Sequence, residues 1–175
     1  MRFLPSVRKA FRACEQNDLY TRRVPLIRTM EHVVPRAILR THALDPGASD
    51  DLHNIFPVDN ALNCSRADFR FAEWGSEAER YSLGVDFEAK VFRPPLVCRG
   101  VIARTIMYMS DTYHFDPEIV IESSLLDRWL VNETDEYELV HDEWARRYSG
   151  KKNPFLGTRI RISTTPCRAS GDFNI

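Results

Sequence analysis

The segment Glu31-His32-Val33-Val34-Pro35 places a carboxylate directly before an imidazole in a short apolar run. We expect this segment to be extended, because Pro25 and Pro35 disfavour a helix around it. In an extended backbone neighbouring side chains point to opposite faces, so Glu31 and His32 point apart. One of them could hold a metal ion while the other acts from the far side of a substrate. The pair is equally compatible with an ordinary surface dipeptide, so its meaning depends on the segments that follow.

A second polar segment is Asp51-Leu52-His53-Asn54-Ile55-Phe56-Pro57, in which His53 lies among polar residues next to an apolar run. It follows a turn-rich stretch, and we expect residues 41–53 to form a loop. The segment is compatible with a functional site. It is also compatible with a turn held by local hydrogen bonds between side chains and backbone.

A third segment, Asn60-Ala61-Leu62-Asn63-Cys64-Ser65-Arg66, predicts a short helix that Asp59 would cap. Asn63 and Arg66 are three positions apart and would share a face of this helix. An amide oxygen together with a carboxylate is a hard oxygen set suited to Mg²⁺, which keeps most of its waters and takes few protein ligands. The spacing alone does not bring Asn63 and Glu31 together.

The remaining hydrophobic patterns predict mostly helices in the second half of the chain. Thr134 is expected to cap the last helix and Gly150 to follow its end. The Met and aromatic stripes of these helices are interpreted as core. The expected elements are a helix over 5–17, extended segments over 24–27 and 30–34, a strand over 85–91, and helices over 96–113, 117–130 and 134–149. The apolar face of the last helix is expected to be Tyr137, Val140, Trp144 and Tyr148.

Length and composition indicate one globular domain. The chain has 175 residues, of which 43% are hydrophobic and 28% charged, as in ordinary water-soluble proteins. No apolar run approaches the roughly 18 residues that a membrane span needs, and the first residues lack the apolar centre of a signal peptide. We therefore expect no membrane insertion and favour an intracellular, packaged or delivered protein over an exported one.

Positive charge is concentrated at both ends of the chain, although the net charge is only −1. Residues 1–40 hold nine basic and three acidic residues, and residues 146–175 hold seven basic residues and one acidic residue. If the two ends fold onto one face, they form a phosphate-binding surface. The alternative is two solvated termini without a special role.

The four cysteines show no metal-binding spacing. Cys14, Cys64, Cys98 and Cys167 form no CxxC or CxxH pair, so a zinc site is not expected. Two disulfides are possible outside a reducing compartment, but we favour four free thiols.

Taken together, the motifs resemble the endonuclease I family of sequence-non-specific nucleases, which carry a ββα-metal (His-Me finger) site. The resemblance covers roughly residues 24–156 and depends on five blocks in a compatible order. These blocks are Glu31-His32-Val33-Val34-Pro35, residues 51–57, Asn63 with Arg66, residues 85–109 with Arg99-Gly100-Val101-Ile102-Ala103-Arg104-Thr105, and Lys152-Asn153-Pro154-Phe155.

The resemblance implies an α+β fold: residues 1–175 would form a single nuclease domain, with a ββα-metal core and a small sheet packed against several helices. A basic N-terminal helix and a C-terminal tail would be appended. It further implies that His32 is the general base and that Glu31 and Asn63 hold one Mg²⁺ ion. The enzyme would hydrolyse phosphodiester bonds of DNA with little sequence specificity and leave 5′-phosphate ends, with RNA as a further candidate substrate.

The resemblance leaves the phosphate contacts and the partners open. Arg36, Arg40 and Arg66 are the candidates for binding the substrate; the alternative for each is a solvated arginine, and only Arg66 is favoured over that alternative. His53 and Asn54 are expected to brace the strand that carries His32. Because a free nuclease would harm its own host, an inhibitor or a packaging partner is expected besides nucleic acid. The alternatives are a catalytically silent packaging or architectural protein of the same fold and a structure-selective processing nuclease. His42, His114 and His141 are interpreted as surface or core residues.

Overall fold

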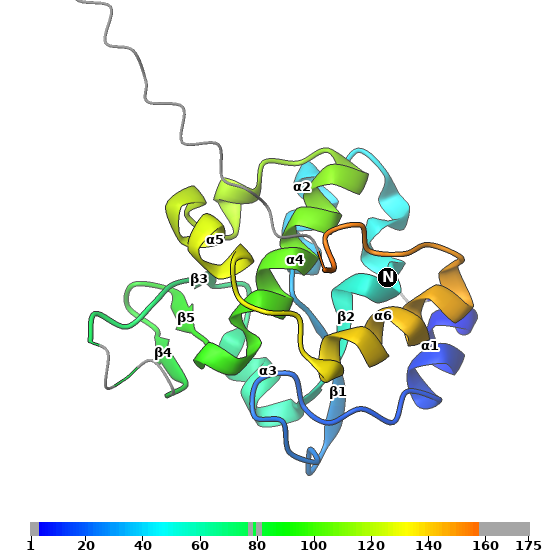
Figure 1. Ribbon diagram of the computed structural model, residues 1–175, viewed down its shortest axis with the longest axis horizontal. Helices are drawn as coiled ribbons and strands as arrows, with labels where there is room; N and C mark the ends of the chain where they lie inside the picture. The colour runs from blue at the N-terminus through cyan, green and yellow to red at the C-terminus, as the bar shows by residue number, and fades with distance from the viewer. Residues whose placement is uncertain (1–3, 77–78, 80–81, 158–175) are drawn as a thin grey trace, which may run out of the picture.

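Helices make up most of the computed structural model, which describes residues 4–76, 79 and 82–157, and two small β-sheets lie beside them (Figure 1). The fold class is α+β, as predicted. The α-helices of the described residues are α1 (Pro5–Arg12), α2 (Arg36–His42), α3 (Asn60–Arg66), α4 (Leu96–Tyr113), α5 (Ser123–Leu130) and α6 (Glu136–Ser149). Their strands are β1 (Arg28–His32), β2 (Ile55–Asp59), β3 (Arg70–Phe71), β4 (Gly84–Asp86) and β5 (Val91–Arg93). Short 3-10 turns are η1 (Pro46–Asp50), η2 (Leu52–Asn54) and η4 (Pro117–Ile119).

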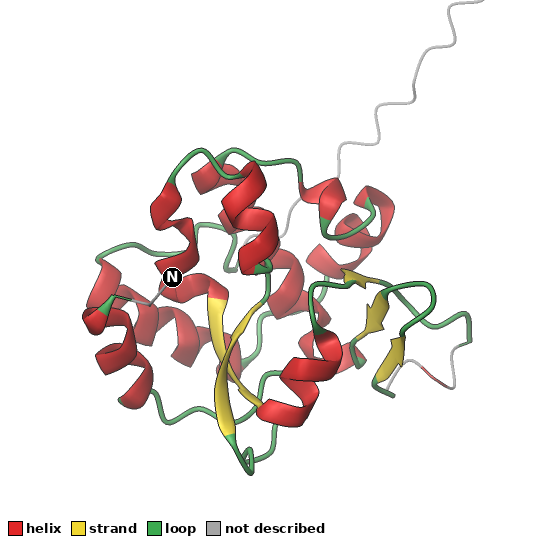
Figure 2. Ribbon diagram, turned by 180° about the vertical axis from the view of Figure 1, so that it is seen from behind, coloured by secondary structure: helices red, strands yellow, loops and turns green. Residues whose placement is uncertain are grey.

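The first sheet pairs β1 with β2 in antiparallel order, and α3 begins directly after β2. Glu31 lies opposite Phe56 in the register, and His32 lies opposite Ile55. The Asp59 side chain accepts a hydrogen bond from the Ala61 amide and caps α3, as the sequence predicted. Helix α3 packs against both strands, and Figure 2 shows the strand pair crossing in front of the helices. The segments carrying residues 31, 32 and 63 therefore form one local unit.

The connection between β1 and β2 is more structured than the sequence indicated. It holds α2, η1 and η2, whereas residues 41–53 were expected to form a loop. Helix α2 was missed because Pro35 was taken only as a sign against helix. In the structure Pro35 is the N-cap, with an extended backbone (φ −56°, ψ 141°), so its missing N–H costs nothing there.

The main hydrophobic core is built around α4. This helix has the predicted bounds, Leu96–Tyr113, and twelve of its residues are buried. It packs on α5 and on η2, and Figure 1 shows it passing through the middle of the molecule. Among the described residues, no helix is long and apolar enough to cross a membrane.

A second hydrophobic cluster joins the two basic ends of the chain. It packs α1 residues against Leu52, Ile55 and the α6 residues Trp144 and Ala145, and the Trp144 indole donates a hydrogen bond to the Ala10 carbonyl (3.2 Å). Helices α1 and α6 are thus adjacent, as Figure 1 shows, and α6 leads into the basic C-terminal segment.

The predicted apolar face of α6 is right for Trp144, which is buried, and for Tyr137, which packs against the main core, but wrong for the other two residues. Val140 and Tyr148 are each 50% exposed. The helix instead buries Glu138, His141 and Asp142. Their partners lie on other segments: Arg104 binds Glu138, Gln16 and the Leu52 carbonyl contact His141, and the Asn153 backbone amide donates to Asp142, which offsets the usual cost of burying polar groups.

Three other expected elements differ in the structure. Residues 85–91 form a hairpin of β4 and β5 rather than one strand, because the Asp86 carboxylate accepts from the Ala89 amide (2.9 Å) and closes a turn. The helix predicted over 117–130 is split into η4 and α5, and α1 ends at Arg12. The cap of α6 is Asp135 rather than Thr134, since the Asp135 side chain accepts from the Glu138 amide. The three described cysteines, Cys14, Cys64 and Cys98, are free thiols. Cys167 and most of the C-terminal tail lie outside the described residues.

Candidate active site at the end of the first strand

His32 is the last residue of β1, and one atom of its ring is fixed by the backbone. Its Nε2 lies 2.9 Å from the Ser49 carbonyl oxygen of η1. A carbonyl oxygen only accepts hydrogen bonds, so Nε2 must carry the proton. In the neutral ring Nδ1 then holds the lone pair. The connection between the two strands therefore selects the tautomer of His32.

Burial keeps this imidazole neutral. The side chain is 7% exposed, and desolvation lowers the pKa of His32 to about 4, with smaller contributions from the charges of Arg36 and Arg66. At neutral pH the ring is consequently unprotonated and has a defined acceptor atom, so it is able to take up a proton.

Glu31 lies on the other side of β1 and is held by two side chains. It is 2% exposed. The Tyr20 hydroxyl donates to its Oε1 (2.7 Å), and the Nε of Arg66 lies 3.2 Å from the same oxygen. Burial raises the pKa of Glu31, while the Arg66 charge and the Tyr20 hydrogen bond oppose that rise.

Asn63 is oriented by β1. Its amide nitrogen donates to the Thr29 hydroxyl (3.0 Å) and to the Met30 carbonyl (3.1 Å). Because that carbonyl can only accept, the amide assignment is determined and Oδ1 points away from these two partners. Arg66, one turn further along α3, binds Glu31. The structure thus brings Glu31 and Asn63 to the same side of β1.

The donor set fits a hard divalent cation. Glu31 supplies a carboxylate held at one oxygen, and Asn63 supplies an oriented amide oxygen. Mg²⁺ prefers oxygen ligands and takes one or two from the protein while keeping waters. The described residues contain no cluster of three His, Cys, Asp or Glu side chains placed to hold a metal ion. Glu31 with Asn63 is a different kind of set, because it contains only one such side chain.

Arg66 is not at a surface that a substrate can reach, contrary to the prediction that it contacts phosphate. It is 0% exposed. Its guanidinium donates to the Val33 carbonyl (2.7 Å) and to the Ala67 carbonyl (2.9 Å) in addition to its ion pair with Glu31. A side chain committed to these partners positions Glu31 instead of binding substrate.

The other two candidate arginines lie on α2. Arg36 and Arg40 are four residues apart and share a face of the helix. Arg40 is exposed and Arg36 is half-buried. The charge of Arg36 acts on His32, since it lowers the pKa of that imidazole. The structure therefore places Arg36 near the candidate base.

Tyr20 and Ser49 are site residues that the sequence analysis did not identify. The Asp18 carboxylate accepts from the Tyr20 and Thr21 amides (both 2.8 Å) and from the Asp59 amide (2.7 Å), which anchors the loop beside β2. Ser49 acts through its carbonyl oxygen, which any residue type supplies. Neither position carries a periodic or motif signal.

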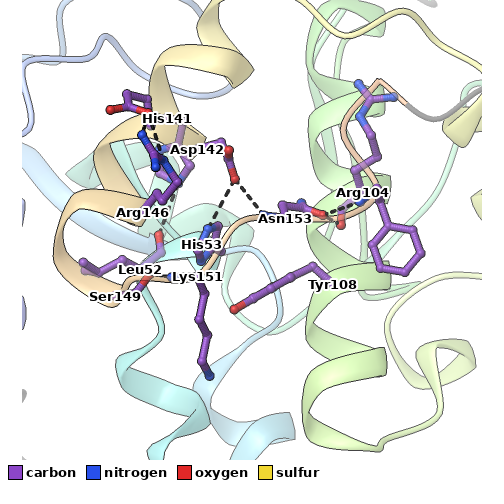
Figure 3. A network of polar contacts seen from close by, with 12 residues as sticks. Leu52, His53, Arg104, Tyr108, His141, Asp142, Arg146, Ser149, Lys151 and Asn153 are labelled. Atoms are coloured by element: carbon purple, nitrogen blue, oxygen red, sulfur yellow. Dashed lines mark hydrogen bonds and ion pairs between the residues drawn. The ribbon is translucent and has the colours of Figure 1, made fainter.

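His53 belongs to a separate buried network, shown in Figure 3. Its Nδ1 lies 3.1 Å from Asp51 and its Nε2 lies 3.4 Å from Asp142, the latter contact lacking hydrogen-bond geometry. The hydroxyls of Tyr108 and Tyr113 donate to the second oxygen of Asp51 (2.9 and 2.7 Å). Both ring nitrogens of His53 thus face carboxylates, so the network connects η2, α4 and α6 and leaves no ring atom directed at a substrate.

The C-terminal Asn-Pro-aromatic motif completes that network. The Asn153 backbone amide donates to the Asp142 carboxylate (2.8 Å), and the Asn153 side chain donates to the Arg104 carbonyl (3.3 Å) (Figure 3). Arg104 in turn binds Glu138 of α6 through Nε (2.7 Å). These residues fasten α6 to α4.

Asn54 braces the strand that carries His32, as predicted. Its side chain accepts from the Val34 amide (2.8 Å) and donates to the Val34 carbonyl (2.9 Å). The prediction for His53 holds only in the wider sense that its role is architectural. Of the other histidines, His42 and His114 are exposed and His141 is buried.

Comparison with known proteins gives a consistent assignment. The family model described as Endonuclease I matches residues 12–158. An extracellular deoxyribonuclease of Aeromonas hydrophila is 31% identical over 112 residues, which cover 61% of this chain and 48% of that protein. Endonuclease-1 of Buchnera aphidicola subsp. Baizongia pistaciae is 29% identical over 122 residues, 66% of this chain and 49% of that protein. A periplasmic deoxyribonuclease of Aeromonas hydrophila is 30% identical over 111 residues, 61% of this chain and 46% of that protein.

Two consequences follow from these similarities. The chain spans about half the length of the curated relatives it matches. The names of the Aeromonas relatives, extracellular and periplasmic, point toward export. The expectation that an intracellular or packaged location is favoured over export is therefore wrong.

Proposed function

Because the chain belongs to the endonuclease I family, we propose that it is a nuclease that hydrolyses phosphodiester bonds of DNA. The β1–β2–α3 unit would be its ββα-metal core, and cleavage would have little sequence specificity and leave 5′-phosphate ends. The names of the relatives, which are deoxyribonucleases outside the cytosol, support DNA encountered there as the substrate.

The observation that carries the proposal is the hydrogen bond between His32 Nε2 and the Ser49 carbonyl. It leaves Nδ1 as the basic atom in a ring that burial keeps neutral. In the proposed reaction Nδ1 takes a proton from a water molecule, and the resulting hydroxide attacks phosphorus in line with the leaving 3′ oxygen. His32 then loses that proton from Nδ1 to solvent, and the leaving 3′ oxygen takes a proton from a solvent water to become the hydroxyl.

Glu31 and Asn63 would hold one Mg²⁺ ion. When bound, such an ion stabilises the negative charge that develops on the phosphate oxygens and on the leaving oxygen. The protein prepares both ligands beforehand. Tyr20 and Arg66 fix the carboxylate, while Thr29 and the Met30 carbonyl fix the amide. Partners that hold the ligand side chains in place reduce the reorganisation needed when a metal ion binds.

Arg36 and Arg40 are proposed to contact the phosphates near the scissile bond. They follow His32 on the next element of the chain, and α2 presents both on one face. An arginine guanidinium binds phosphate oxygens in a bidentate manner. Arg66 is left out of this role because it is buried.

The test is a plasmid assay with purified protein. Supercoiled DNA is incubated with Mg²⁺ or with EDTA, using wild type, His32→Ala and His42→Ala. His42 is exposed on α2 and serves as the matched control. We expect cleavage that needs Mg²⁺, is lost in His32→Ala and is kept in His42→Ala.

Two outcomes would contradict the proposal. Equal cleavage by His32→Ala and wild type would show that the assigned base is wrong. DNA that is bound but not cut by wild type, with Mg²⁺ or with any other divalent metal, would favour the packaging or architectural alternative.

A further inference from the structure

A groove lined by arginines runs beside the candidate site, between α1 and β1. Its volume is about 520 Å³. It is formed entirely by two segments, residues 8–12 of α1 and residues 28–30 of β1. The lining residues are Arg8, Phe11, Arg12, Arg28, Thr29 and Met30.

The groove shares two residues with the surroundings of the candidate metal site. Thr29 and Met30 line it, and these same residues accept the hydrogen bonds that orient Asn63. Along β1, Arg28, Met30 and His32 alternate onto one side of the strand. The groove therefore lies along the side of β1 that ends at His32, the candidate base.

Two of the three arginines that line the groove belong to α1. This helix carries Arg8, Lys9 and Arg12 and no acidic residue. Arg8 and Arg12 are both exposed and, four residues apart, lie on one face. Because an arginine fork matches phosphate oxygens, the groove suits a phosphodiester chain better than a neutral ligand.

Arg28 has a different part, because it fastens α1 to the strand. Its Nη2 donates to the Phe11 carbonyl (3.1 Å) and to the Cys14 carbonyl, and its guanidinium lies over the Phe11 ring (4.6 Å to the centroid). A cation at the C-terminal end of a helix is favoured by the helix dipole. Arg28 thus positions the helix that presents Arg8 and Arg12.

We propose that Arg8 and Arg12 bind the phosphate backbone of the DNA at a distance from the bond that is cut. Arg28, the strand residue that holds α1, lies four positions before His32, which is about 13 Å along β1 at about 3.3 Å per residue. This length equals about four base-pair steps of about 3.4 Å. The groove would then determine how long a duplex must be to bind with full affinity. This inference rests on the proposed nuclease function.

The test compares Arg8→Gln/Arg12→Gln with Arg70→Gln/Arg128→Gln. The control pair removes the same charge from arginines that are 51% and 58% exposed on β3 and α5. Binding to a duplex of about two helical turns, roughly 20 base pairs, is followed by fluorescence anisotropy in EDTA over a series of salt concentrations. Circular dichroism melting curves check that all variants are folded.

We expect the Arg8→Gln/Arg12→Gln variant to bind several-fold more weakly, with a slope of log K against log salt that is shallower by about 1.8, since each lost phosphate contact removes about 0.9. The difference between the variant and wild type, in binding affinity and in KM, should become smaller as the duplex is shortened toward the cleavage site. The control should bind with the wild-type slope. An unchanged slope in the groove variant, or an equal loss in the control, would overturn the proposal.

Because binding is measured without Mg²⁺, this result does not depend on cleavage. A wild-type protein that binds through the groove but cuts no DNA with any metal would remove the nuclease function and keep the groove. If wild type cuts DNA but the Arg8→Gln/Arg12→Gln variant shows the wild-type salt slope, the nuclease function is kept and the role of the groove is removed.

Discussion

His32 and His53 are both buried histidines with a carboxylic residue one or two positions before them in the sequence, yet their surroundings differ in one respect. One ring nitrogen of His32 is held by a backbone carbonyl, which determines that the other is basic. Both nitrogens of His53 face carboxylates, Asp51 and Asp142. The comparison teaches that the partners of an imidazole, rather than its motif, decide whether it can exchange a proton with a substrate.

The largest effect expected from this comparison is on catalysis. His32→Ala should lower the rate of DNA cleavage about 100- to 10,000-fold, the range that a general base contributes. Its unfolding free energy should fall less than that of the Asp51 variant described next. Plasmid cleavage and urea unfolding measure the two quantities, and His42→Ala is the control. A variant that unfolds readily but retains its rate would reverse the two roles.

The network around His53 should respond mainly through stability. Asp51→Ala removes the acceptor for two tyrosine hydroxyls and for His53, which leaves buried donors unpaired. We expect a loss of about 3–5 kcal/mol in the free energy of unfolding, measured by urea denaturation. Asp50→Ala, at the half-buried neighbouring position, should cost much less. Equal losses for the two variants would rule out the network as the cause.

The pH dependence of stability provides a third way to test His32. Its pKa is lowered from 6.5 to about 4 in the folded protein, so between these values the unfolded chain binds the additional proton. Stability from this group is therefore complete above pH 6.5 and is lost as the pH falls. Between pH 7 and pH 5 the loss should be about 2 kcal/mol.

His32→Gln removes this titration, because glutamine can still donate to the Ser49 carbonyl but does not ionise. Urea unfolding at several pH values, in EDTA, should therefore show a smaller pH dependence for the variant than for wild type. Parallel curves for the two proteins would show that His32 is not held neutral by burial.

The smallest effect, on the Mg²⁺ requirement, is expected from the hydrogen bond between Tyr20 and Glu31. Tyr20→Phe removes one hydrogen bond to the carboxylate and should raise the Mg²⁺ concentration for half-maximal cleavage about tenfold, the lower end for such contacts. Tyr148→Phe, at a side chain that is 50% exposed, is the control. An unchanged Mg²⁺ requirement in Tyr20→Phe would separate Glu31 from the metal.

Local features of the site were predictable because they depend on near neighbours. A strand around Glu31 and His32 and a helix capped by Asp59 follow from short-range rules of backbone geometry and hydrogen bonding. The bounds of α4 follow from its periodicity and from the prolines before it. The missed elements, α2 and the β4–β5 turn, depend on a proline at a helix start and on one side-chain hydrogen bond, which the periodicity of the sequence does not reveal.

The sequence by itself determined that Glu31 and His32 point to opposite faces, since the period of a strand is two residues. Only the tertiary structure decided that Asn63 lies on the same side of β1 as Glu31, because α3 reaches β1 through a strand pairing across a long connection. It also decided that Arg66 is buried beside Glu31 rather than exposed to substrate. The protonated nitrogen of His32 is likewise set by a carbonyl 17 residues away. Contacts between distant segments select such states, and no local pattern encodes them.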